Sequence, residues 1–420
     1  MTNIGAADRV ENNAERDRVV HSADARSARL AASMSGTNLA RAGDYNQRTV
    51  LQAIRLGGET TRVELAALTG LTAPTIANIT KRLTELGLVR LVGRRQGARG
   101  QPALQLSINP DGAFAIGLNI DRDHISLALV DLAGAVRRLV RREVDFALPP
   151  DVVAFAREQV AALLSAEGVR DEHVLGVGVA MPDDLGRITI PHRPAAYDAW
   201  NSIDIASLLR EVLPWPVHVD NDAAAAALGE AQQRTGHDGQ TFFYLLISAG
   251  LGGGPVIDGN YFRGASLRSG EIGLMPDPSS DRVGAVVQDT VSVSALRARF
   301  ESAGKNSDLA NLVSQDPSCR LIVDAWIRDA ARSLASPVVA VNCLINPAAI
   351  LIGGRLPLPI VTQLVEALEA TLDSTSLPSR APILAAVTAE DGAVIGAAAL
   401  PFLDNVLPSD SILIQAGRRD

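Results

Sequence analysis

Apolar positions near the start of the chain repeat at helical spacing in three successive stretches. The first stretch begins at Tyr45 and ends at the Gly57-Gly58 pair. The second is short and opens at Thr61, which has Glu64 three residues later. That spacing predicts a capping box, in which each side chain satisfies a free backbone N–H of the other residue. A tight glycine-containing turn then leads into the third stretch.

The third stretch predicts a helix from Thr72 to about Leu86, with Gly87 at its C-terminus. One of its faces is apolar and comprises Ile76, Ile79, Leu83 and Leu86. The opposite face carries short polar groups followed by cations: Thr72, Pro74, Thr75, Asn78, Lys81 and Arg82. Two short helices joined by a glycine-containing turn are typical of a helix-turn-helix, whose second helix lies in the major groove of double-stranded DNA. We therefore expect this polar face to contact base edges and phosphates.

Two strands, 88–92 and 103–106, are predicted after this helix, with a segment rich in glycine and arginine between them. A hairpin of this kind forms a wing whose cations reach phosphates or a minor groove. The candidate DNA contacts in the wing are Arg94, Arg95, Arg99, Gly100 and Gln101. A surface helical hairpin with a flexible loop is the alternative. The order of capped helix, glycine turn, polar face and basic wing favours a winged helix-turn-helix.

Beyond a predicted turn at 109–112, strands and helices alternate to the end of the chain. The predicted strands are 115–118, 125–131, 135–144, 174–180, 216–219, 242–247, 255–257, 348–352 and 383–386. The predicted helices and helical blocks are 151–166, 223–233, 291–346, 359–372 and 392–400. Three strands followed by alternating helices and strands, given twice, are the plan of a two-lobed actin-like ATPase domain. The predicted fold class is therefore α/β, with a winged helix-turn-helix ahead of such a domain.

Composition and charge fit this plan. Apolar residues make up 47% of the 420 residues and aromatic residues only 4%, so small aliphatic side chains must build the core, as suits buried parallel strands. The net charge is −8, but residues 41–108 carry ten basic and four acidic side chains, so the rest of the chain carries −14. A basic segment on an acidic body indicates a module that binds nucleic acid. An ordinary solvated surface is the alternative for the charge taken alone.

The cysteines and histidines predict no metal or disulfide site. Cys319 and Cys343 lie outside any CxxC motif and are expected to be small core residues. His124 is expected to be an ordinary residue. No stretch of about 18 apolar residues occurs, and residues 1–40 lack the apolar core of a signal peptide. We predict a cytoplasmic protein without a membrane segment.

Several motifs occur in a fixed order along the chain: Thr69-Gly70-Leu71-Thr72, Arg99-Gly100-Gln101-Pro102, Asn221-Asp222 before an alanine-rich helix, Gly270-Glu271-Ile272-Gly273 and Ile352-Gly353-Gly354. As a set they resemble the ROK family of repressors and sugar kinases over about residues 45–402, and in particular its regulator branch. The resemblance implies a hexokinase-like body that senses a sugar or sugar derivative and assembles as a homodimer or homotetramer. The expected segments are a disordered 1–40, a DNA-binding 41–110, an effector and oligomerisation domain 111–405 and a tail 406–420.

The nucleotide side of a ROK kinase site is not kept. The family's first phosphate loop, D-x-G-x-T-K or a near variant, corresponds here to 119–124, where Asn119 replaces the leading acid and Asp121 and Arg122 replace glycines. Asp121 and Asp123 would stand where a triphosphate sits, and their charges would repel it. The second loop, 248–254, keeps enough glycine for a turn, but a glycine corner between strands explains it better. We predict no catalytic residues, no cofactor and no kinase activity.

The sugar side is better kept. By resemblance, Asn221, Asp222 and Glu271 contact sugar hydroxyls, and Gln288 stands near the position of a further glutamate. Leu274 replaces a histidine that binds zinc and sugar in the family, and 280–289 contains no cysteine, so the structural zinc is predicted to be absent. The alternative for Asn221 and Asp222 is a helix cap without any ligand.

Three hypotheses follow. The leading one is a DNA-binding regulator, a repressor of carbohydrate genes, whose degenerate kinase-like body senses a sugar. The second is a residual ROK sugar kinase with a DNA-binding head, which the first phosphate loop opposes. The third is a regulator that needs no small ligand and acts through a protein partner. The retention of Asn221, Asp222 and Glu271 argues against the third.

Overall fold

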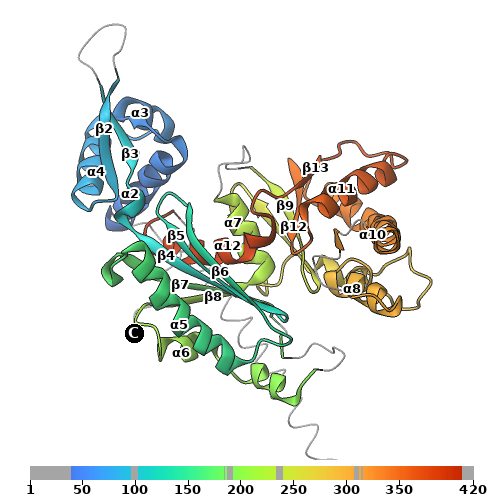
Figure 1. The fold of residues 1–420 in the computed structure, drawn as a ribbon. Helices are drawn as coiled ribbons and strands as arrows, with labels where there is room; N and C mark the ends of the chain where they lie inside the picture. The colour runs from blue at the N-terminus through green and yellow to red at the C-terminus, as the bar shows by residue number, and fades with distance from the viewer. Residues whose placement is uncertain are drawn as a thin grey trace, which may run out of the picture.

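The computed structural model describes residues 39–95, 103–183, 185–186, 193–232, 240–306, 312–313 and 316–408. They form a small N-terminal head and a larger two-lobed body (Figure 1). The predicted disordered segment lies outside these residues except for its last two positions, which begin a helix. The predicted tail is described only as far as Pro408.

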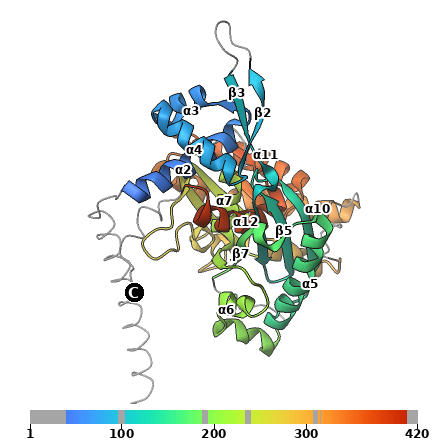
Figure 2. The same ribbon diagram turned by 90° about the vertical axis from the view of Figure 1, so that its left-hand side faces the viewer.

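The head is the predicted winged helix-turn-helix. It contains three helices, α2 (Leu39–Gly57), α3 (Arg62–Thr69) and α4 (Ala73–Glu85), and three strands, β1 (Thr60–Thr61), β2 (Val89–Arg95) and β3 (Ala103–Ile108), in the order β1-β3-β2. The predicted capping box is present: Thr61 accepts a hydrogen bond from the Glu64 backbone N–H, and Glu64 accepts one from the Thr61 N–H. Figure 2 shows β2 and β3 extending away from the body.

The apolar face of α4 ends earlier than predicted. Ile76 and Leu83 are buried, but Leu86 is 54% exposed because it is the C-cap, after which the chain turns at Gly87 (φ 72°). Thr80 takes a place in the core instead. Its hydroxyl lies 3.0 Å from Nε of Arg62, which ties α4 to α3.

The body consists of two lobes whose sheets have the same strand order. The sheet of lobe 1 runs β6-β5-β4-β7-β8, and that of lobe 2 runs β11-β10-β9-β12-β13. The first three strands of each lobe pair antiparallel and the later two pair parallel. The strands of lobe 1 are β4 (Phe114–Ile120), β5 (His124–Asp131), β6 (Val136–Glu143), β7 (Val174–Met181) and β8 (Val217–Asn221). Those of lobe 2 are β9 (Phe242–Ile247), β10 (Leu251–Ile257), β11 (Asn260–Tyr261), β12 (Ala349–Gly354) and β13 (Ile383–Ala385).

Helices cover both sheets and fill the space between them (Figure 1). Lobe 1 has α5 (Pro149–Glu167) and α6 (Ile205–Arg210) on its outer side, and lobe 2 has α8 (Val293–Ser302), α10 (Pro317–Leu344) and α11 (Leu358–Leu372). Between the sheets lie α7 (Asp222–Ala231) and α12 (Gly392–Asn405). The predicted strands and helices of the body are thus present, the 291–346 block as α8 and α10. Sequence reasoning missed α6 and β11.

One of the two cysteine predictions is wrong. Cys319 is buried, as predicted, but Cys343 is exposed. It follows the buried residues Val341 and Asn342 on α10, and one further step of about 100° around the helix takes it off the buried face.

The head and lobe 1 share one hydrophobic core. The turn predicted at 109–112 is present as a 3-10 turn at Pro110–Gly112. Across it, Val50 and Ile54 of α2 belong to the same buried cluster as Leu132 of lobe 1 and Phe402 of α12. Any movement of the head relative to lobe 1 must therefore rearrange packed side chains, because the two parts are not joined by a flexible hinge alone.

Candidate functional site

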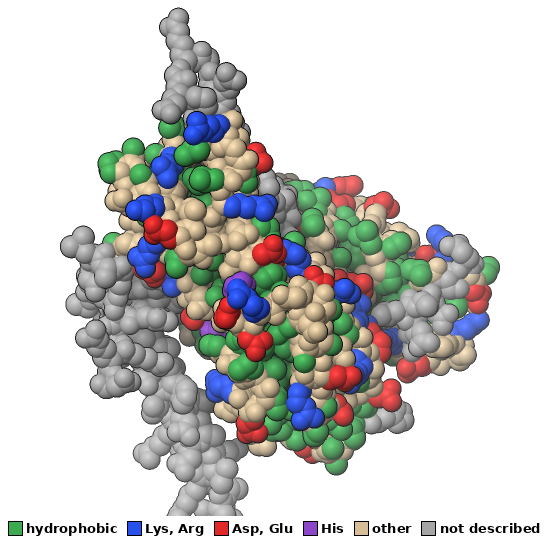
Figure 3. Space-filling model, turned by 60° about the vertical axis from the view of Figure 1, so that its left-hand side comes forward, with side chains coloured by type: hydrophobic (Ala, Val, Ile, Leu, Met, Phe, Trp, Pro, Cys, Tyr) green, Lys and Arg blue, Asp and Glu red, His purple; other side chains and the backbone are tan. Residues whose placement is uncertain are grey.

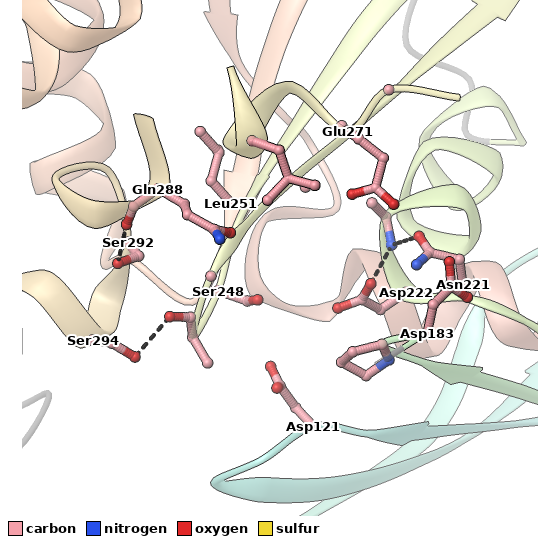
Figure 4. A pocket seen from close by; sticks show the side chains of 18 of the residues that line it. Asp121, Asp183, Asn221, Asp222, Ser248, Leu251, Glu271, Gln288, Ser292 and Ser294 are labelled. Carbon is pink, nitrogen blue, oxygen red and sulfur yellow. Dashed lines mark hydrogen bonds between the residues drawn. The ribbon is translucent and has the colours of Figure 1, made fainter. Parts of the chain in front are cut away.

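A cavity of about 720 Å³ lies in the cleft between the lobes (Figure 4). Its lining includes all four of the predicted sugar contacts, Asn221, Asp222, Glu271 and Gln288. Figure 4 shows the first three gathered at one end and Gln288 at the other end, beside Ser292. The structure therefore brings three of the four residues together and places Gln288 apart.

Asn221 and Asp222 stand where β8 ends and α7 begins. Asn221 is the N-cap: its Oδ1 accepts hydrogen bonds from the backbone N–H groups of Ala223 (2.9 Å) and Ala224 (3.2 Å). Asp222 Oδ1 also accepts from Ala223, at 2.9 Å. Both side chains line the cavity, so capping uses some of their atoms while the others face the space where a ligand would lie.

The loop after β11 brings Glu271 to the same end of the cavity. Arg263 on this loop donates two hydrogen bonds, of 2.7 and 2.6 Å, to Asp220 of β8, which fixes the loop against lobe 1. Arg268 then donates from Nε to Glu271 at 2.9 Å and lies 3.9 Å from Asp183. Sequence reasoning missed Arg268. Its position three residues before Glu271 was the available signal.

Carboxylates dominate this end of the cavity. Burial raises the pKa of Asp222 to about 7, and the nearby charges of Asp121 and Asp183 add to the effect. Asp121 is only 3% exposed and points into the cavity (Figure 4). Such an arrangement suits a ligand that donates hydrogen bonds through several hydroxyls, and it disfavours a phosphate group.

We expect the protein to become less stable as the pH rises from about 4 to 7, through Asp222. Its pKa rises from 3.8 to about 7 on folding, so the folded chain retains a proton that the unfolded chain has released. That stability is fully present below the unfolded pKa and is lost by at most about 1.4 kcal/mol per pH unit up to the folded pKa. Urea unfolding of wild type and Asp222→Asn at pH 5 and pH 8 measures the effect. The free energy of unfolding of the variant relative to wild type should be larger at pH 8 than at pH 5. An equal relative stability at the two pH values would contradict a raised pKa of Asp222.

The first phosphate loop differs from its prediction at Asp123. We expected Asp121 and Asp123 both to repel a phosphate, but the carboxylate of Asp123 is paired with arginine side chains of lobe 2. Arg297 of α8 reaches its Oδ2 at 2.5 Å, and Arg355, directly after β12, reaches its Oδ1 at 3.0 Å. Burial alone would raise the pKa of Asp123, but the hydrogen bond with His124 and the charges of Arg355 and Arg297 hold it well below its usual range. Of the two carboxylates of this loop, Asp121 and not Asp123 lines the cavity.

His124, predicted to be an ordinary residue, lies within this ion cluster. It is buried, and its Nδ1 lies 3.0 Å from Asp123 Oδ1 and 3.0 Å from Arg355 Nη1. Asp121, Asp123 and His124 come close enough together to hold a metal ion. The guanidinium of Arg355 already lies against two of these three ligands, so its positive charge opposes a cation there.

The second glycine loop is a corner of close backbone packing. A Cβ on Gly270 would lie 2.2 Å from the Gly253 carbonyl oxygen, and one on Gly252 would lie 2.8 Å from the Ala223 side chain. These glycines allow β10, the 270 loop and the start of α7 to touch. The geometry therefore supports the glycine-corner interpretation.

The DNA-binding candidates on α4 face solvent. Thr72, Pro74, Asn78, Lys81 and Arg82 are exposed and Thr75 is half-buried. Thr72 is also the N-cap, and its hydroxyl lies 2.8 Å from that of Thr75. Lys and Arg side chains are spread over the head in Figure 3. The exposed face is free to enter a groove.

In the wing, the structure describes only part of the predicted contact set. Arg94 is exposed on β2, and the backbone of Arg95 pairs with Ala103. Arg99, Gly100 and Gln101 lie outside the described residues.

Among the helices of the described ranges, none is long and apolar enough to cross a membrane.

Comparison with known proteins identifies both parts of the chain. Residues 115–402 match the ROK family, and residues 44–90 match a winged helix-turn-helix DNA-binding family. An uncharacterized protein of Sinorhizobium fredii is 30% identical over 370 residues, which are 85% of this chain and 90% of the relative. The xylose repressor of Bacillus spizizenii is 26% identical over 231 residues, which are 55% of this chain and 60% of the repressor.

A solved structure has the same arrangement of domains. It is a ROK family transcriptional regulator described as a homolog of the E. coli MLC protein, with a TM-score of 0.62 and 24% sequence identity. The superposition covers 89% of this chain and 97% of that regulator. The likeness extends through head and body together.

Proposed function

This chain belongs to the ROK family, and we propose that it is a DNA-binding repressor of carbohydrate genes whose body senses an unphosphorylated sugar. The observation that carries the proposal is the placement of Asn221, Asp222 and Glu271 around one cavity, in a chain whose α4 presents an exposed polar face. The xylose repressor among its relatives supports the same function. As a DNA-binding regulator it would act in the cytoplasm.

We propose that the body has no kinase activity. The turn between β4 and β5 presents Asp121 to the cavity where a phosphate loop would present backbone N–H groups. Asp123 and Arg355 form an ion pair across the lobes at the same place. A residual kinase would need Mg-ATP to enter there, and ADP release in the presence of ATP and each sugar tests it. We expect no release above the background without protein.

We also propose that the protein assembles as a homodimer or homotetramer. Two heads joined through their bodies would read half-sites separated by one helical turn of DNA or a multiple of it. A change in the relation of the heads would then make the half-sites fit or misfit.

Fluorescence anisotropy tests the proposed function. The probe is the intergenic DNA beside the protein's own gene, at fixed salt, because phosphate contacts make the affinity steeply salt-dependent. The sugar panel is D-xylose, D-glucose, N-acetyl-D-glucosamine and N-acetyl-D-mannosamine. We expect one sugar to weaken DNA binding, and Asp222→Ala to abolish that response while DNA binding persists. Tight DNA binding without any sugar response would favour the alternative, a regulator that acts through a protein partner.

A further inference from the structure

Helix α7 connects the cavity to the DNA-binding head. Its first residues, from the N-cap Asn221 to Ala223, line the cavity. Its C-cap is Gln232, whose Oε1 accepts a hydrogen bond of 3.0 Å from Nη1 of Arg55. Arg55 belongs to α2 of the head, is 7% exposed and also donates from Nε to the Leu132 carbonyl at 3.1 Å.

Helix α12 ends at the same head helix. Arg48, two turns before Arg55 on α2, directs its Nη1 to the last carbonyls of α12: Leu403 (3.3 Å), Asp404 (2.7 Å) and Leu407 just beyond the helix (3.4 Å). A guanidinium is favoured there because carbonyl groups at a helix C-terminus lack intrahelical partners and carry partial negative charge. Two arginines of α2 therefore hold the C-terminal ends of α7 and α12. We call Arg48 and Arg55 the arginine bracket.

The two helices held by the bracket belong to different lobes. α7 packs on β9 and β10 of lobe 2, whereas α12 packs on β4 and β7 of lobe 1. They cross at glycines with their backbones in contact: a Cβ on Gly396 would lie 1.6 Å from the Ala225 carbonyl oxygen. A rotation of the lobes must therefore turn α7 against α12 about this crossing. Gln232 lies close to the crossing, which includes Gly229, so the rotation moves the distant C-terminal end of α12 relative to Gln232.

We propose that the arginine bracket converts a rotation between the lobes into a reorientation of the DNA-binding head. α2 shares a packed core with α4 through Val50 and Ile54, so a shift of α2 carries the recognition helix with it. Packed cores switch between discrete arrangements rather than deform. When the C-terminal ends of α7 and α12 move relative to each other, α2 must therefore either move together with the rest of the head or lose a hydrogen bond of the bracket. Arg48, Arg55 and Gln232 are positioning residues that touch neither DNA nor sugar. The inference rests on the proposed function, since a sugar at the start of α7 provides the rotation.

The test uses the full chain, the same intergenic DNA and the same sugar panel. Gln232→Ala removes the acceptor for Arg55, while Gln232→Glu keeps one. Arg138→Ala is the matched control, because it deletes the exposed ion pair with Glu167 on lobe 1, away from the bracket. Calorimetry gives each variant's sugar affinity separately from its DNA affinity.

We expect Gln232→Ala to keep its DNA affinity without sugar within about threefold and to keep its sugar affinity. The sugar-induced change in DNA affinity, which for coupled sites is typically about 5- to 150-fold, should fall at least fivefold in this variant. Gln232→Glu and Arg138→Ala should retain the full change.

Two results would overturn the bracket while leaving the proposed function intact. One is a Gln232→Ala variant with the full sugar response. The other is a Gln232→Ala variant that loses DNA binding without sugar, because the contact would then only hold the head in place. If no sugar of the panel changes the DNA affinity of the wild type, the proposed function fails and the bracket fails with it.

Discussion

Gly178→Ala should destabilise the body by at least about 3 kcal/mol, the upper part of the range for an overpacked core. Gly178 lies in the middle of β7, and a Cβ there would be 1.7 Å from the carbonyl oxygen of Ala397 and 2.6 Å from its carbonyl carbon. Both atoms belong to the backbone of α12, so no side chain can step aside. The methyl group must push α12 away from the sheet of lobe 1.

Thermal and urea unfolding followed by circular dichroism measure this effect. Gly43→Ala in α2 is the control, because the position is exposed, helical and has no atom within 4 Å of the added methyl group. Helix propensity alone should make that control neutral or more stable by up to about 1 kcal/mol. If Gly178→Ala unfolds at the same temperature and urea concentration as the wild type, α12 does not lie on β7 as described.

Asn78→Ala should weaken binding to the specific DNA by about 1–3 kcal/mol, or roughly 5- to 150-fold, and should relax the preference for one base. Asn78 is exposed on α4, and an amide at this point of a recognition helix can hydrogen-bond an adenine edge in two places. Folding should be unaffected because the side chain packs against nothing in the core.

Lys81→Ala, one turn further along α4, should behave differently. Its side chain is 74% exposed and its ion pair with Glu85 is long, at 3.8 Å, so its ammonium group is available to a phosphate. We expect a similar loss of affinity on all DNA sequences. The slope of log affinity against log salt concentration should be smaller in magnitude by about one.

Anisotropy titrations on specific and scrambled DNA at several salt concentrations measure both changes. Asn260→Ala and Lys305→Ala, on the body, are the matched controls and should leave DNA binding unchanged. Equal losses for Asn78→Ala on specific and scrambled DNA would show that this face of α4 does not read bases.

The sequence by itself determined the elements that local interactions create. The capping box of Thr61 and Glu64 involves residues three apart, and the apolar face of α4 repeats within four residues, so both are visible along the chain. The alternation of strands and helices predicted the two lobes in the same way. The prediction failed at Leu86 and Cys343, where the exposed face depends on what packs nearby.

The candidate site was only partly visible in the sequence. Asn221, Asp222 and Glu271 were predicted from the resemblance of their motifs to those of the ROK family, and the tertiary structure brings them to one cavity. Gln288 was assigned from position alone, and it lies at the other end. Arg268 was missed because its one signal in the sequence is its position three residues before Glu271, and that spacing indicates an ion pair only once the conformation of the loop is known.

Only the tertiary structure decided how the parts are joined. Asp123 and Arg355 are 232 residues apart, and Arg55 and Gln232 are 177 apart, so no periodicity or spacing could pair them. The same holds for the glycines between α7 and α12, which the sequence shows simply as small residues in apolar helices. Local patterns fix secondary structure because neighbours in sequence are neighbours in space. Long-range hydrogen bonds, ion pairs and backbone crossings form only when packing brings distant segments together. In this protein one of them, the hydrogen bond between Arg55 and Gln232, joins the helix that begins at the cavity to the head.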